Sequence, residues 1–204
     1  MAIAPCIGCN HSHRGFSNSS ESGIMSLYES LRGYAAHYPN DSHVVACMAF
    51  LMEAERPFDR DHATGHFTGS AWLVDPEGQH VLLTHHRKLN RWLQLGGHAD
   101  GDSDLAAVAL REAHEESGMT GLSVDPAIYD VDRHWIPARN EEPGHWHYDV
   151  RYVVRAHARD AFVVSDESLD LAWVSIRALA DDDATDESLR RMARKWLERE
   201  TSTD

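Results

Sequence analysis

The first periodic hydrophobic pattern in the chain lies between residues 25 and 55. Apolar side chains recur there at intervals of three and four residues, the spacing of one face of an α-helix. Pro39 interrupts the pattern, because proline disfavours helix in the residue before it, and Asp41 is a suitable N-cap for a second helix. We therefore predict a pair of helices within 25–55. Their apolar positions are Leu27, Leu31, Tyr34, Val44, Val45, Met48, Phe50 and Leu51.

Residues 1–24 are rich in Ser, Gly and Asn and show almost no apolar periodicity. We expect them to form a flexible leader, with Met25 as a candidate start of the natural chain. A spacing that suits a zinc ion occurs within this leader, at Cys6, Cys9, His11 and His13. No second ligand pair follows at the distance of a zinc finger, so a mobile tail is the competing interpretation.

After residue 65 the pattern changes to short runs of β-branched, aromatic and aliphatic residues. The runs HFTGSAWLVD and VLLTHH predict a hairpin, and RWLQLGG predicts a short strand that ends in glycine. A helix is predicted from Ser103 to Ser117, behind a cluster of cap-forming residues and before Gly118. The remaining predictions are strands at 127–136, 146–156 and 171–174 and an amphipathic helix at 187–197.

Strands mixed with helices and without repeats favour one sheet covered by helices. The predicted fold class is α/β, specifically an α/β/α sandwich with a mixed, partly curved central sheet. We expect one domain over 25–204 that includes the N-terminal helical pair.

Composition narrows the functional classes. The chain has 204 residues and a formal net charge of -14, which disfavours binding to a nucleic acid duplex. The longest apolar run, 44–52, is far shorter than the roughly 20 residues that cross a bilayer, so no membrane association is expected. Three cysteines are too few for a disulfide framework, and a cytoplasmic location is predicted.

The predicted helix at 103–117 carries Glu112, Glu115 and Glu116 at positions i, i+3 and i+4, which places three carboxylates on one side. Three like charges at close range favour a bound cation, and hard oxygen ligands suit Mg²⁺ or Mn²⁺. The alternative is a solvated acidic helix face that pairs with Arg111 and surface bases.

The residues before this helix favour the first interpretation. Gly96 and Gly97 end an apolar strand, and the loop HADGDSD leads directly into the helix N-terminus, an order that builds a phosphate-facing pocket. From Gly97 to Met119 the sequence resembles the box of the Nudix hydrolases, which ends in R-E-hydrophobic-x-E-E-x-G-hydrophobic. Every spacing is kept, and one position departs: Ser103 stands where the box has its first Glu.

The resemblance implies that Glu112, Glu115 and Glu116, with the Gly97 carbonyl, bind one or more Mg²⁺ or Mn²⁺ ions, and that Arg111 orients the carboxylates. It implies hydrolysis of a diphosphate bond by an activated water. Family members take their general base from the box or from a later loop, so Glu112 and Glu167 are both candidates here. An ordinary exposed loop residue is the alternative for Glu167.

Two further groups of residues are candidates for binding. Arg87 and Lys88 form a basic stretch that could hold the distal phosphate or ribose of the substrate, or a solvated turn. His66, His98 and His147 lie at predicted strand ends and would converge on Zn²⁺ or a similar ion if the strands pair as expected. Solvated or hydrogen-bonded histidines are the alternative.

The sequence therefore favours a metal-dependent hydrolase of a diphosphate bond in a nucleoside diphosphate linked to another moiety. The expected partner is a small phosphorylated, nucleotide-derived substrate, and a homodimer stays open. His66 and His98 are also similar in placement to the histidines of isopentenyl-diphosphate isomerase, a Nudix-fold enzyme, but Gly96 stands where that enzyme has its catalytic Cys. A third hypothesis is a non-catalytic Nudix-fold sensor of nucleotide or metal, which Ser103 supports.

Overall fold

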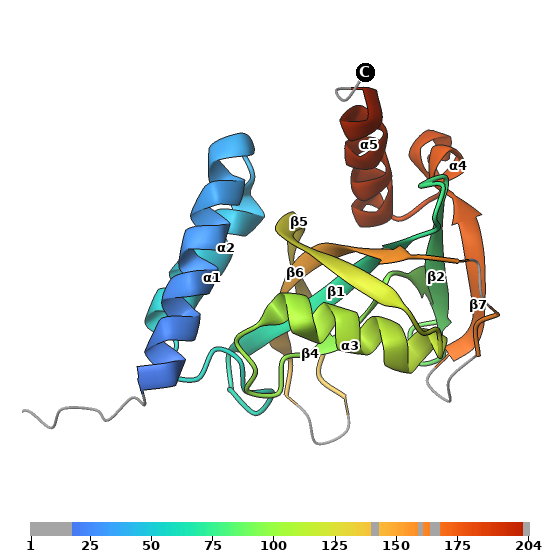
Figure 1. Cartoon of the computed structure of the whole chain (residues 1–204). Coiled ribbons are helices and arrows are strands. Elements are labelled where there is room, and N and C mark those ends of the chain that lie inside the picture. Colours follow the sequence, from blue (N-terminus) through green and yellow to red (C-terminus); the bar gives the residue numbers. More distant parts are fainter. Residues whose placement is uncertain (1–17, 140–142, 159–160, 164–167, 202–204) are drawn as a thin grey trace, which may run out of the picture.

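The structure is a computed structural model that describes residues 18–139, 143–158, 161–163 and 168–201. In it a mixed sheet is flanked by helices, with a helical pair beside the sheet (Figure 1). This arrangement confirms the predicted fold class and its helical N-terminal segment. Among the described residues, no helix combines the length and apolarity that crossing a bilayer requires.

The helical pair consists of α1 (Asn18–His37) and α2 (Ser42–Glu53). The Asp41 side chain accepts a hydrogen bond from the backbone N–H of His43, as an N-cap does. Helix α1 begins before Met25, so the expectation of a leader over all of 1–24 is wrong for 18–24. Residues 1–17, with the four Cys and His of the zinc-like spacing, lie outside the described residues.

Seven strands form the sheet in the described part of the chain: β1 (Gly65–Val74), β2 (His80–His86), β3 (Arg91–Leu93), β4 (Leu95–His98), β5 (Leu122–Ile136), β6 (His145–Ala156) and β7 (Ser168–Ser175). The order is β3-β2-β1-β6-β5, with β4 paired to β1 and β7 paired to β2. The sheet is mixed because β1 and β6 run parallel, whereas the other pairs are antiparallel.

The predicted hairpin is present as β1 and β2 around a turn at Asp75, whose carboxylate accepts from the backbone N–H of Gln79 and of His80. The single strand predicted for RWLQLGG is wrong. The segment divides at Gln94 into β3, which pairs with β2, and β4, which pairs with β1.

Helix α3 (Leu105–Ser117) lies against one face of the sheet. The Asp104 side chain caps its N-terminus through the N–H of Ala107, and Gly118 ends it with a φ of 66°, in the left-handed region that favours glycine. Gly69 of β1 allows the close approach, because a Cβ there would lie 2.8 Å from the carbonyl oxygen of Leu105. The helix begins at Leu105, slightly later than the predicted Ser103.

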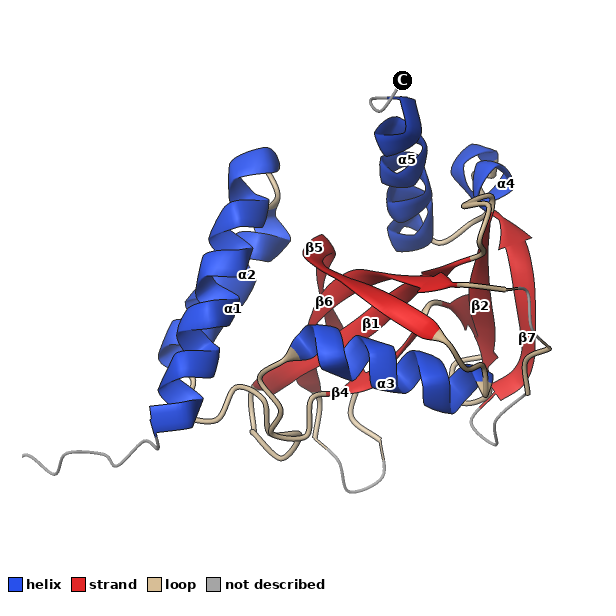
Figure 2. Ribbon diagram, viewed as in Figure 1, coloured by secondary structure: helices blue, strands red, loops and turns tan. Residues whose placement is uncertain are grey.

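Helices α4 (Ile176–Asp181) and α5 (Glu187–Thr201) pack on a separate apolar cluster of the sheet (Figure 2). This cluster uses Trp72, Val74 and Val153 of the strands, whereas α1, α2 and α3 share the larger cluster with Phe67, Leu73 and their neighbours. Side chains of β1 alternate between the two clusters, as a strand with both faces covered requires. The sequence did not predict α4.

Candidate active site

A pocket of about 750 Å³ is lined by strands β1, β2, β4, β5 and β6 and by α3. The alternation along β1 explains its place. Thr68 and Ser70 line the pocket, and two residues further along the same face Trp72 enters the apolar cluster beneath α4 and α5. One face of the strand is therefore polar where it is open and apolar where helices cover it.

Strand β6 shows the same change along its length. His147 and Asp149 line the pocket, Arg151 follows on the same face, and Val153 lies in the apolar cluster. The parallel register sets His147 beside His66, and Asp149 beside Thr68. Polar rows of the two strands thus meet side by side on the pocket floor.

Three carboxylates of α3, those of Glu112, Glu115 and Glu116, line the pocket, as their helical spacing predicts. The backbone N–H of Gly96 donates to Oε1 of Glu116 at 2.7 Å. Gly97 stands against Glu112, since a Cβ on Gly97 would lie 2.5 Å from Oε2 of Glu112. The two glycines of β4 therefore bring bare backbone to the carboxylates of α3.

Arg111 connects the same helix to the end of β4. Its Nη2 donates to Oε1 of Glu112 at 3.0 Å and to the carbonyl oxygen of His98 at 3.1 Å. The guanidinium thus fixes one of the three carboxylates relative to the strand, the position expected for a residue that orients them.

The loop between β4 and α3 is held by Arg60, whose guanidinium binds both carboxylate oxygens of Asp100 at 2.6 and 2.8 Å. This hydrogen-bonded pairing lowers the pKa of Asp100, and both residues line the pocket. This pair could not be predicted from the sequence, because the two residues are far apart in the chain.

Ser103 occupies the position where the Nudix box has Glu. The structure gives a physical reason for a small side chain at this position. A Cβ on Gly23 of α1 would lie 2.1 Å from Oγ of Ser103. Helix α1 therefore passes directly over residue 103, where the small Ser side chain fits and a longer one would meet the helix.

Asp149 is a residue of the pocket that was not singled out from the sequence. It is buried, and its carboxylate accepts hydrogen bonds from Thr68 Oγ1 at 2.9 Å, Ser70 Oγ at 2.7 Å and Arg151 Nε at 2.7 Å. The available signal was the alternation of His147, Asp149 and Arg151 in an otherwise apolar strand. Asp149 holds the polar floor of the pocket in one arrangement.

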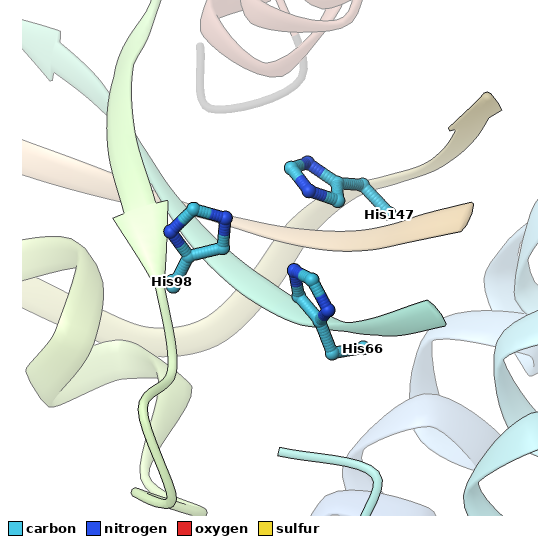
Figure 3. Close-up of side chains that lie close together, drawn as sticks. All are labelled: His66, His98 and His147. Carbon is cyan, nitrogen blue, oxygen red and sulfur yellow. The ribbon is translucent and has the colours of Figure 1, made fainter. Parts of the chain in front are cut away.

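The remaining residues that were predicted for the site differ in where they lie. Lys88 lines the pocket, whereas Arg87 donates from Nη2 to the carbonyl oxygen of Ser168 at 2.9 Å and ties the β2–β3 turn to β7. Glu167 lies outside the described residues. His66, His98 and His147 come together (Figure 3), and His98 and His147 also line the pocket.

The residues that form the candidate site also match a known protein family. The family model of the NUDIX domain matches residues 66–196, which include the whole pocket-forming sheet from β1 onward and most of α5. Among curated protein sequences, none matches the chain.

Solved structures share the fold. An Ap4A hydrolase from C. elegans, in a binary complex, is 16% identical with a TM-score of 0.53, covering 67% of this chain and 98% of that one. The dihydroneopterin triphosphate pyrophosphohydrolase of E. coli is 16% identical with a TM-score of 0.53, covering 65% and 95%. In both, the similarity excludes about a third of this chain, and at this identity it concerns the fold alone.

Proposed function

The chain belongs to the Nudix family, and on that premise we propose that it is a metal-dependent hydrolase. The proposed reaction is cleavage of the diphosphate bond in a nucleoside diphosphate linked to another moiety. One observation carries the proposal: Glu112, Glu115 and Glu116 face a pocket into which Gly96 and Gly97 present bare backbone.

The residues present fit a hard divalent cation. Carboxylate oxygens are the ligands that Mg²⁺ and Mn²⁺ prefer, and three of them around one pocket would otherwise repel one another. The groups that would hold Mg²⁺ or Mn²⁺ are Glu112, Glu115, Glu116 and the carbonyl of Gly97. Such an ion, when bound, supplies positive charge against phosphate oxygens and lowers the pKa of a coordinated water.

The protein's own groups prepare this site. Arg111 holds the Glu112 carboxylate beside β4, and the N–H of Gly96 holds that of Glu116. Preorganised groups of this kind lower the barrier because they need no rearrangement as charge develops on the phosphate. Lys88, on the wall of the pocket, is our candidate for binding the distal phosphate.

The general base is either Glu112 or Glu167. Glu112 lies in the pocket and accepts a hydrogen bond from Arg111. A base must accept a proton from water, so removing it lowers kcat and leaves substrate binding in place. This difference separates the base from a residue that only binds the cation.

The test is a substrate panel with Mg²⁺, Mn²⁺ and Zn²⁺ in parallel, which includes a dinucleoside tetraphosphate, a nucleoside diphosphate sugar and a nucleoside triphosphate. We expect metal-dependent release of phosphorylated products. In Glu116→Gln, kcat should fall on the order of 100-fold or more. Glu53→Gln, at an exposed position in α2, is the matched control and should keep the activity.

Glu112→Gln and Glu167→Gln should then differ, and the variant with the larger loss in kcat at unchanged KM identifies the base. Absence of turnover on the whole panel would contradict the proposal. Tight nucleotide binding without turnover would replace it with the sensor hypothesis. An isomerase finds no support at Gly96, whose N–H serves Glu116 and which carries no thiol.

A further inference from the structure

Three histidines from three strands meet at one end of the pocket. In the sheet register His66 of β1 pairs with His147 of β6, and His98 of β4 lies opposite Thr68, the next residue on that face of β1. One ring nitrogen of each lies within 4.8 Å of the others. Figure 3 shows the three imidazoles directed toward a common space.

His66 has no hydrogen-bond partner among the described residues. Its side chain is almost fully buried, with 2% of the residue exposed, and neither ring nitrogen has a hydrogen bond. A buried polar group without a hydrogen-bond partner is unfavourable, so the two unpaired nitrogens of His66 point to a ligand that this side chain can bind. The space into which His66 points is shared with His98 and His147.

The three side chains indicate which kind of ion would fit. Imidazole offers nitrogen ligands and no negative charge to attract Mg²⁺, whereas ions such as Zn²⁺ and Co²⁺ bind imidazole well.

His145, the first residue of β6, lies next to the three histidines. Its Nδ1 lies 3.0 Å from the carbonyl oxygen of Pro143, which can only accept, so Nδ1 is the donor in this contact. The Nε2 of His145 lies 3.2 Å from Nε2 of His147. Two nitrogen ligands of one tetrahedral zinc ion are about 3.3 Å apart, given Zn–N distances of roughly 2.0–2.1 Å.

We propose that His66, His98 and His147 form a second metal site, distinct from the carboxylates of α3, that takes a divalent transition ion of the Zn²⁺ type. His145 is its neighbour and either holds His147 through a hydrogen bond or supplies a further ligand. His98 and His147 also line the pocket, so an ion at this site is within reach of a molecule bound there. The proposal does not depend on the proposed hydrolysis.

The first test measures metal binding directly. The full chain, with Cys6→Ser and Cys9→Ser to remove other sulphur ligands, is titrated with Co²⁺ and followed by its visible absorption, and Zn²⁺ is added as the competitor. We expect one Co²⁺ per chain in a site that Zn²⁺ displaces. His66→Gln and His147→Gln should weaken Co²⁺ binding at least about tenfold. His157→Gln, at an exposed position, is the control and should leave it unchanged.

Two results would overturn the proposal. One is equal Co²⁺ affinity in His66→Gln, His147→Gln and the parent chain. The other is loss of the Co²⁺ spectrum in Glu115→Gln but not in the histidine variants, which would place the ion at the carboxylates.

A second measurement needs no substitution in the cluster, because a buried histidine variant can fail to fold. The side-chain ¹⁵N resonances of the histidines in the unmodified chain are recorded as Zn²⁺ is added. Binding shifts those of His66, His98 and His147, whereas those of His157 and His37 stay in place. Zn²⁺ binding that leaves the three cluster resonances unmoved would place the ion elsewhere and exclude the site.

Discussion

Gly97 shows how a single missing side chain shapes the candidate active site. A Cβ at this position would lie 2.5 Å from Oε2 and 2.6 Å from Cδ of Glu112, a distance that forces the carboxylate to move. Gly97→Ala should therefore displace Glu112 and lower kcat on the order of 100-fold, the effect of a misplacement near 1 Å. Steady-state kinetics on the best substrate of the panel, with circular dichroism to verify folding, would measure it.

Gly33 provides the matched control, because no atom lies within 4 Å of a Cβ built there. Gly33→Ala in α1 should keep full activity and stabilise the helix by about 0.5–1 kcal/mol. Equal activity of the two alanine variants would mean that the contact between Gly97 and Glu112 is unimportant for turnover.

At the scale of elements, the N-terminus of α3 is the connection between the pocket loop and the carboxylates. Oδ1 of Asp104 accepts the N–H of Ala107 at 3.0 Å, which satisfies one of the unpaired donors of the first turn. Asp104→Ala should lower the free energy of unfolding by about 1 kcal/mol, and Asp104→Asn, which still caps, by much less. Urea denaturation would measure both, and equal losses would contradict the capping role.

Elements whose signals are local were predictable from the sequence. Helix α3 has an N-cap at Asp104, a left-handed glycine at 118 and a small apolar face, and its prediction was correct within two residues. Helix α4 has six residues and too few turns for a period to appear, so it was missed. The division of RWLQLGG at Gln94 depends on two different partner strands, which no local pattern contains.

The parts of the candidate site that depend on local patterns were also predictable from the sequence. The carboxylates of α3 follow from helical spacing alone, and the strand faces of β1 and β6 follow from alternation. The contacts that hold these site residues in place do not follow from any local pattern. The contacts of Asp149 with Thr68 and of Arg60 with Asp100 join segments far apart in the chain, and their existence depends on the parallel pairing of β1 with β6 and on loop conformation.

At the scale of the whole molecule, a buried ion network joins the sheet to its flanking helices. The guanidinium of Arg151, buried in β6, donates to Asp149, Asp130 and Asp132. Arg191 of α5 also binds Asp130, at 2.7 Å. Helix α5 is thereby fixed to the floor that carries the pocket, and removing one partner would leave a buried charge unpaired.

Asp132 makes this network sensitive to pH. Burial raises its pKa, but the charges of Arg151 and Arg191, with His43 of α2 and His134 of its own strand, outweigh burial and lower the pKa to about 2. In the unfolded chain an Asp has a pKa of about 3.9. A depressed pKa in the folded state means that the carboxylate stabilises the fold above this unfolded value, and that the contribution is lost as pH falls toward 2.

Asp132→Asn removes the titration while it keeps the size and shape of the side chain. The difference in free energy of unfolding between the parent chain and Asp132→Asn should therefore shrink by about 2 kcal/mol as pH falls from about 6 to about 2. Denaturation at a series of pH values measures it. Asp183→Asn, at a side chain that is 96% exposed, should show almost no such change. A pH-independent difference for Asp132→Asn would mean that this carboxylate is not ionised against Arg151 in the folded protein.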